Sequence, residues 1–302
     1  MDSRARDDET TVTTKPRVRL VTFATAGFRA RRAVISMSAR RYGGVTDLCV
    51  WSRARLRKTE FWRQHRDILN EPLGAGCWLW KPFIILDALR SVDEGDFVVY
   101  LDCGRDPWIV IGHRLDPLLD WCAAAGGVLP GIYVPQFGAN RLWTKRDCFV
   151  LLGCDAARYW DHCQVQTNVS VWQKNQHALT IVRAWLDACS DPRVLVDGPN
   201  QCGKPDLAGF IEHRQDQSVM TLLALKHPLA ALGNPKGPSV FGLWSKDVDF
   251  GLAEMGAARQ RSIGLYLLKR AVAVPWFGRL TLRALKRIVL RIAGVRRAER
   301  PY

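Results

Sequence analysis

An apolar run that ends in a carboxylate is the first segment of this sequence that could do chemistry. Val98–Leu101 leads directly into Asp102, and Gly104 stands two residues further on. Ligands of open α/β sheets bind at the carboxyl ends of strands, where a carboxylate can hold a divalent cation against phosphate oxygens. The alternative is an aspartate that only caps the turn after the strand, and this segment alone leaves both readings open.

A second segment, residues 74–82 (GAGCWLWKP), places two glycines and two tryptophans before a helix that opens at Lys81 and Pro82. Helix N-termini attract phosphate, and Lys81 would add positive charge there. The simpler interpretation is that both tryptophans are core residues and that glycine permits the turn. Taken alone, the segment favours the simpler interpretation.

Two further segments carry clusters of polar side chains. His213–Ser218 (HRQDQS) precedes an apolar helix, with Asp216 at a plausible N-cap position and His213 as either a metal ligand or an ordinary surface histidine. In Gln166–Ser170, Thr167 and Asn168 enter an apparent strand. They either line a site or only begin that strand.

The elements around these segments alternate between strands and helices. Apolar and β-branched runs predict strands over 18–25, 45–52, 96–101 and 166–173. Helical patterns continue through Arg41 and cover 59–69, 80–92, 144–152, 176–189 and 216–226. This order predicts an α/β fold with a Rossmann-like, largely parallel sheet flanked by helices. The Pro- and Gly-rich stretch 190–209 is long for a connection and is typical of a functional loop.

Composition and charge divide the chain into three parts. With 48% hydrophobic and 24% charged residues over 302 positions, the chain has enough apolar surface for a sizeable core. Residues 1–16 are polar and predict a mobile leader, residues 17–261 a folded domain, and residues 262–302 a basic helical tail. Residues 258–302 hold twelve Lys and Arg against one Glu, whereas the remainder of the chain has a net charge of only +4.

The tail pattern is typical of a helix that lies in a lipid interface. Leu282, Leu285, Ile288 and Ile292 fall on one helical face, and Arg and Lys fall on the other. We therefore expect residues 262–302 to bind an anionic membrane surface peripherally. The alternative is a pair of ordinary helices that pack on the catalytic domain.

The cysteines and the hydropathy pattern bear on the cellular compartment. The nine cysteines form no C-x-x-C pair, which disfavours a zinc ribbon, and most stand in apolar surroundings. The sequence shows no apolar segment typical of an export signal or of a spanning helix. These features predict a cytoplasmic protein held on the inner face of the cell membrane by its tail.

Six short strings, taken in order, resemble bacterial GT-A-type glycosyltransferases of surface-polysaccharide synthesis. They are TFAT at 22–25, GAGCWLWKP at 74–82, YLDCG at 100–104, WTKRD at 143–147, TNVS at 167–170 and HRQDQS at 213–218. The resemblance covers roughly 17–227, and WLWKP and HRQDQS are its specific parts. It implies a nucleotide-diphospho-sugar transferase fold, with a more distant likeness to family 8 glycosyltransferases through the Asp-Gln pair.

The resemblance also implies roles for individual residues. Asp216 and Gln217 would be catalytic, near the transferred sugar, and Asp102 and His213 would bind a divalent cation, Mn²⁺ or Mg²⁺. The donor-binding residues would be Thr22, Ala24, Trp80, Lys81, Asp102 and Asn168. Gly104 stands where the family has the second Asp of its D-x-D motif, which puts the geometry of the metal in question.

The sequence thus predicts a metal-dependent glycosyltransferase. It would move a sugar from a nucleotide-sugar donor, a UDP-sugar above all, to a saccharide or lipid-linked acceptor. A basic nucleic-acid-binding protein is the first alternative, but the near-balanced body argues against a nucleic-acid partner. The second alternative is an inactive GT-A scaffold without the second Asp. Retention or inversion stays open; an inverting enzyme would need a base such as Asp216 or Glu212.

Overall fold

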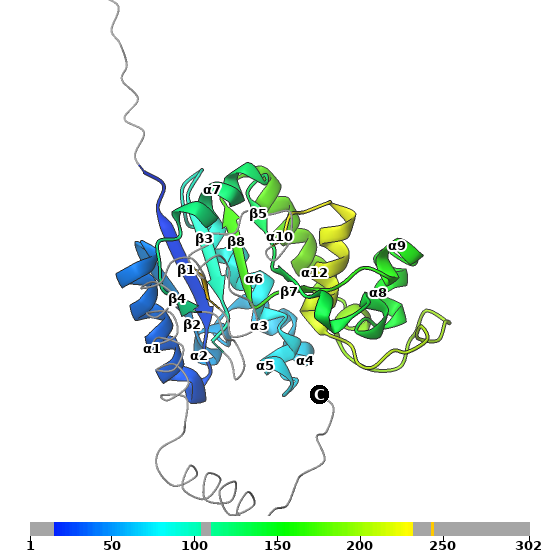
Figure 1. Ribbon diagram of the computed structural model, residues 1–302. Coiled ribbons are helices and arrows are strands. Elements are labelled where there is room, and N and C mark those ends of the chain that lie inside the picture. Colours follow the sequence, from blue (N-terminus) through cyan, green and yellow to red (C-terminus); the bar gives the residue numbers. More distant parts are fainter. Residues whose placement is uncertain (1–14, 104–109, 232–242, 245–302) are drawn as a thin grey trace, which may run out of the picture.

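A five-stranded mixed sheet forms the centre of the protein, seen here in a computed structural model that describes residues 15–103, 110–231 and 243–244 (Figure 1). The strand order is β2-β1-β3-β8-β5. The strands are β1 (Val18–Phe23), β2 (Asp47–Trp51), β3 (Phe97–Leu101), β5 (Val128–Leu129) and β8 (Val169–Gln173). β1 pairs in parallel with β2 and β3, whereas β8 runs antiparallel to β3 and β5. Four of the five strands therefore point the same way.

Helices cover both faces of this sheet. The longer ones are α1 (Arg29–Ser38), α6 (Trp80–Arg90), α7 (Asp116–Ala124), α8 (Arg146–Leu151), α10 (Gln176–Cys189) and α12 (Gln215–Lys226). Shorter ones are α2 (Arg53–Leu56), α3 (Glu60–Gln64), α4 (Arg66–Leu69), α5 (Gly74–Cys77), α9 (Ala157–Trp160) and α11 (Pro192–Leu195). Two small ribbons pair β4 (Val110–Ile111) with β9 (Leu243–Trp244) and β6 (Ile132–Tyr133) with β7 (Val165–Gln166).

Strand alternation sends neighbouring side chains into two separate cores. On β3, Val98 and Tyr100 join the apolar cluster under α6, α10 and α12, whereas Val99 and Leu101 join the cluster under α1 and α7. All five residues of β3 are buried. The α/β class and the largely parallel, helix-flanked sheet that the sequence predicts are therefore confirmed.

Two of the predicted elements are divided in the structure. The helix expected over 59–69 is interrupted at His65, whose backbone (φ −116°, ψ 30°) is not helical, and so forms α3 and α4. The strand expected over 166–173 divides into β7 and β8, because the chain turns at Thr167 and Asn168. Most of the expected leader and the whole basic tail, 262–302, lie outside the described residues.

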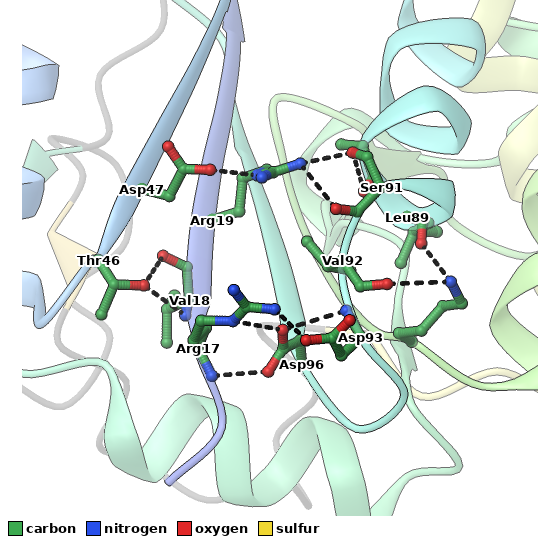
Figure 2. A network of polar contacts seen from close by, with 12 residues as sticks. Arg17, Val18, Arg19, Thr46, Asp47, Leu89, Ser91, Val92, Asp93 and Asp96 are labelled. Carbon is green, nitrogen blue, oxygen red and sulfur yellow. Dashed lines mark hydrogen bonds and ion pairs between the residues drawn. The ribbon is translucent and has the colours of Figure 1, made fainter. Parts of the chain in front are cut away.

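Polar contacts close the edge of the sheet where β1 and β3 begin (Figure 2). Asp96 accepts hydrogen bonds from the Arg17 backbone N–H at 2.8 Å and from Arg17 Nε at 3.0 Å. The hydroxyl of Thr46 accepts from the Val18 N–H and donates to the Val18 carbonyl. The charged groups at this edge of the sheet are thus engaged with one another and with the strand ends.

The thiols and the helix lengths bear on two further expectations. All nine cysteines are free thiols, and six of them are buried as small core side chains. None of the helices in the described part of the chain combines the length and apolar character that a membrane crossing requires.

Candidate functional site

A pocket of about 760 Å³ opens at the edge of the sheet where β1 and β3 end. Five segments that are distant in sequence supply its walls: the end of β1 with the turn after it, the stretch that leads into α6, the residue after β3, the end of β7 with the turn before β8, and the residue before α12. The lining residues are Phe23, Thr25, Phe28, Pro72, Leu73, Gly74, Ala75, Trp78, Trp80, Asp102, Gln166, Asn168 and Arg214.

The pairing of β3 with β8 brings two polar side chains to the pocket together. Leu101 lies opposite Val169 in the antiparallel register, and the Asp102 N–H donates to the Asn168 carbonyl at 2.9 Å. The Oδ1 atom of Asn168 is buried and has no hydrogen-bond partner among the described residues. A buried amide oxygen without a partner is energetically costly, so it marks a place where a ligand or a cation would be stabilised.

The segment before α6 is held in a strained left-handed turn. Five consecutive residues, from Gly74 to Trp78, have positive φ angles between 50° and 111°. Ala75, Cys77 and Trp78 are not glycine, and each left-handed residue of this kind costs roughly 1–2 kcal/mol. Strain of this kind is concentrated at functional sites in proteins. Here it lies in a pocket wall, since Gly74, Ala75 and Trp78 are lining residues.

Aromatic side chains and one hydrogen bond fix this wall in place. The Trp80 ring stacks on the Phe23 ring with centroids 4.1 Å apart and planes 18° from parallel. Trp80 Nε1 donates to the Gly74 carbonyl at 2.9 Å, which joins the two ends of the left-handed turn. Trp78 and Phe28 are partly exposed at the pocket and offer ring surface to a ligand.

A buried ion pair lies behind the pocket lining. Lys81 Nζ is 2.6 Å from Asp216 Oδ2, and the two side chains are 3% and 5% exposed. The Thr167 hydroxyl donates to the same carboxylate oxygen at 2.8 Å and lies 3.0 Å from Lys81 Nζ. We call Lys81, Thr167 and Asp216 the buried triad.

Each member of the buried triad is close in sequence to a pocket residue. Lys81 follows Trp80, Thr167 stands between Gln166 and Asn168, and Asp216 follows Arg214 by two positions. The triad therefore joins three of the five segments that build the pocket. Burial raises the pKa of Asp216, and the Lys81 ammonium opposes that rise. The Oδ2 atom of Asp216 is thus engaged by two partners inside the protein.

The buried triad lies close to a tyrosine in the centre of the sheet. Lys81 Nζ is 5.6 Å from the centroid of the Tyr100 ring, and the Tyr100 hydroxyl is buried without a hydrogen-bond partner among the described residues. Burial, and then the Asp102 and Asp216 carboxylates, raise the pKa of Tyr100 well above its usual range. The phenol therefore stays neutral beneath the pocket.

Three of the residues expected to bind the donor line the pocket: Trp80, Asp102 and Asn168. Thr22 and Ala24 do not. The Thr22 side chain is fully buried and donates to the Leu101 carbonyl at 2.7 Å, while Ala24 belongs to the core under α1 and α7. Their neighbours Phe23 and Thr25 face the pocket instead, because successive side chains of an extended chain point in opposite directions.

The other expected site residues are engaged inside the protein. Lys81 and Asp216 form the buried triad and are not lining residues, and Asp216 is not the N-cap of α12, a position held by Arg214. The Gln217 side chain is hydrogen-bonded to Gln164. The sequence interpretation that placed all three side chains against the ligand is thus not what the geometry shows.

His213 is also engaged, and its geometry does not suit a metal ligand. Its ring is 2% exposed, Nδ1 accepts from the Lys145 N–H at 3.3 Å, and Nε2 donates to the Val194 carbonyl at 2.9 Å. Burial lowers the pKa of His213 to about 3. Within the described ranges no group of three or more His, Cys, Asp or Glu side chains is arranged to hold a metal ion.

The structure adds pocket residues that sequence reasoning did not single out. Arg214 is the one Lys or Arg among the lining residues described, and Gln166, Thr25 and Phe28 join it. In the sequence, these residues could be found only through their neighbours: Arg214 stands inside the HRQDQS string, and Gln166 stands immediately before TNVS.

Comparison with solved structures finds distant neighbours, one of which is described here. No family model and no curated protein matches the sequence. A solved structure titled "WbbM bifunctional glycosytransferase apo structure" is similar at a TM-score of 0.42 and 12% sequence identity. The match covers 74% of this chain and 39% of that one, so the chain spans well under half of its neighbour. A similarity of this degree establishes neither a family nor an activity.

Proposed function

We propose that this protein is a glycosyltransferase that transfers a sugar from a nucleotide-diphospho-sugar, a UDP-sugar above all, to a saccharide or lipid-linked acceptor. The observation that carries the proposal is the pocket where β1 and β3 end, which combines a carboxylate, an orphaned amide oxygen, a guanidinium and aromatic rings. Ligand sites of open α/β sheets lie at this edge.

The pocket groups match the parts of such a donor. Trp78 and Phe28 present ring surface that suits a base or the apolar face of a sugar, Asp102 and Asn168 offer oxygen atoms to hydroxyl groups, and Arg214 carries positive charge. In the transfer, the bond from the anomeric carbon to the diphosphate oxygen breaks and both electrons leave with the nucleoside diphosphate. The acceptor hydroxyl oxygen bonds to that carbon and its proton is released.

A divalent cation, Mn²⁺ or Mg²⁺, fits the oxygen atoms at one side of the pocket. Asp102 and the orphaned Oδ1 of Asn168 are the residues that would hold it, and cations of this type are commonly bound by one or two protein oxygens together with substrate phosphates. When bound, such a cation stabilises negative charge on the departing diphosphate. His213 is not part of this proposal, because both of its ring nitrogens are occupied.

Asp216 has a positioning role in this proposal. Its carboxylate faces Lys81 and Thr167, and through them it fixes the segments that carry Trp80, Asn168 and Arg214. The membrane-bound location rests on residues 262–302 alone and stays a prediction from their sequence.

Nucleotide-sugar binding and turnover test the proposal. Wild-type protein should show thermal stabilisation with a UDP-sugar in the presence of Mn²⁺ and should slowly hydrolyse that donor. Asp102→Asn keeps the side-chain volume and should keep the unfolding midpoint while losing most of the binding and hydrolysis. The matched control is Asp120→Asn on α7, an exposed aspartate outside the pocket. Failure of every nucleotide sugar to bind the wild type would refute the function, and binding without hydrolysis or transfer would identify an inactive scaffold.

A further inference from the structure

Arg214 is fixed at the pocket by contacts on two sides. Its guanidinium carbon lies 4.4 Å from the centroid of the Trp143 ring, and its Nε atom is 2.8 Å from Glu212 Oε1. Its backbone N–H donates to the Trp143 carbonyl at 3.0 Å, so the main chain is anchored to the same residue as the side chain. The guanidinium thus lies against the Trp143 ring beside the pocket.

The outer edge of this guanidinium is unused. Neither terminal nitrogen of Arg214 makes a hydrogen bond to any residue that the structure describes, and the side chain is 32% exposed. The planar arrangement of these two N–H groups matches two oxygens of a phosphate group, which makes arginine well suited to phosphate recognition. The ion pair with Glu212 is largely exposed and leaves this edge open.

The rest of the lining narrows the class of anion. Apart from Asp102 and Arg214, the described lining residues are uncharged, and several of them are aromatic. A simple inorganic anion would use the arginine but not the rings, and a neutral sugar would use the rings but not the arginine. A nucleoside diphosphate uses both, because it has a flat base and a charged diphosphate.

We propose that Arg214 binds the diphosphate of the nucleotide-sugar donor, as the fixed cation opposite the diphosphate when it departs. This inference rests on the proposed function and adds a specific residue to it. It differs from the sequence expectation for Lys81, whose ammonium is used by Asp216 inside the protein. Stabilisation of developing charge by a group already in place is a large contribution to catalysis in general.

The test compares UDP with uridine as ligands of the full-length protein in isothermal titration calorimetry. Arg214→Ala should weaken UDP binding by roughly tenfold to a hundredfold, the usual effect of losing hydrogen bonds to a charged group. Uridine binding should change by less than about threefold, because uridine carries no phosphate. Arg214→Lys should recover only part of the loss, since lysine keeps the charge without the paired N–H groups.

Arg158 provides the matched control. It is exposed on α9, with its guanidinium carbon 4.8 Å from the Tyr159 ring centroid, and it is not a lining residue. Arg158→Ala should bind UDP as the wild type does. Equal loss of uridine and UDP binding in Arg214→Ala would show a structural role and overturn the inference. Unchanged UDP binding in Arg214→Ala would also overturn it while leaving the proposed function intact, whereas a wild type that binds neither UDP nor a UDP-sugar would refute both.

Discussion

Removing Lys81 should leave an uncompensated charge beneath the pocket. In Lys81→Met the methionine fills most of the lysine volume, but Asp216 keeps only the Thr167 hydroxyl as a partner for its buried Oδ2. Breaking a buried ion pair by removing one partner generally costs about 3–5 kcal/mol. The pair is 3% and 5% exposed, so water cannot replace the ammonium without opening the structure.

The protonation of Asp216 sets an upper limit on this loss and gives it a pH dependence. If the buried carboxyl takes up a proton at pH 7, the cost is about 1.4 kcal/mol for each pH unit above its unfolded pKa of about 3.9, or about 4 kcal/mol in total. In the variant, the folded state then holds a proton that the unfolded state lacks. Stability relative to the wild type should therefore rise as the pH falls, and the deficit at pH 5 should be about 1.5 kcal/mol.

Urea denaturation at pH 7 and pH 5 measures both quantities. Lys81→Met combined with Asp216→Asn removes both charges and should recover most of the stability, because no buried charge is left unpaired. The control is Arg63→Met, which removes an ion pair to Glu60 whose side chains are 64% and 59% exposed, and it should lose less than about 1 kcal/mol. An unpaired buried charge at Asp216 is refuted if Lys81→Met is as stable as the control at pH 7. It is also refuted if the loss of stability of Lys81→Met relative to the wild type is the same at both pH values.

Two further predictions concern other features around the site. Burial lowers the pKa of His213 to about 3 in the folded state, whereas the usual histidine pKa is 6.5. Between pH 6.5 and pH 3 the unfolded chain therefore binds a proton at His213 that the folded chain does not. Stability should fall as the pH falls through this window, by up to about 1.4 kcal/mol per pH unit. Urea titrations should show that His213→Gln reduces this slope and that the exposed-site control His177→Gln keeps it; equal slopes in both variants would contradict the assignment. In the left-handed turn, Gly76→Ala would place a Cβ 2.7 Å from the Cα of Leu69 at φ 111° and should lower the thermal midpoint, whereas Ala75→Gly relieves a left-handed alanine and should raise stability by up to about 1 kcal/mol. A lower midpoint for Ala75→Gly would show that this turn is not strained.

Periodicity in the sequence was sufficient to predict the class of the fold and most of the longer elements, but not α7. The helix over 176–189 coincides with α10, and the apolar run 96–101 contains β3. The apolar side chains of each of these elements recur at the spacing of a helix or of a buried strand, and the folded protein buries them. The short strands β5, β6 and β7 have two residues each, which is too few to establish a period.

The phase of β1 shows where the sequence stops being informative about the site. Thr22, Phe23 and Ala24 are all buried, so hydrophobicity does not reveal which of them faces which side. The strand has helices on both faces, and a strand of this kind loses the alternation that marks an outer side chain. The resemblance implies Thr22 and Ala24 as donor contacts, whereas the pocket is lined by Phe23 and Thr25.

The buried triad was hidden from sequence reasoning for a different reason. Lys81 and Asp216 are 135 positions apart, and each alone reads as a charged residue that faces solvent or ligand. Only the packing of α6 and α12 on the same core brings them together. Two opposite charges that pair can be buried at a position where a single charge would be too costly. Within the HRQDQS segment, the side chains of His213 and Asp216 are buried in the protein, and Arg214 lies at the pocket.

Backbone strain and the buried ion pair are linked on the two segments that face each other across the site. Trp78, with φ 58°, stands three residues before Lys81, and Gln215, with φ 39°, stands directly before Asp216. Neither conformation is favourable for a residue with a side chain, so something in the folded state must outweigh it. An apolar contact between α6 and α12 would stabilise the packing without fixing the backbone at these residues, because such contacts are not directional. The ion pair at 2.6 Å between Lys81 and Asp216 is buried and directly joins the chain segments that follow these two strained residues. Trp80 directly precedes Lys81 and Arg214 stands two residues before Asp216, so the ion pair lies next to both a ring and the cation of the pocket lining.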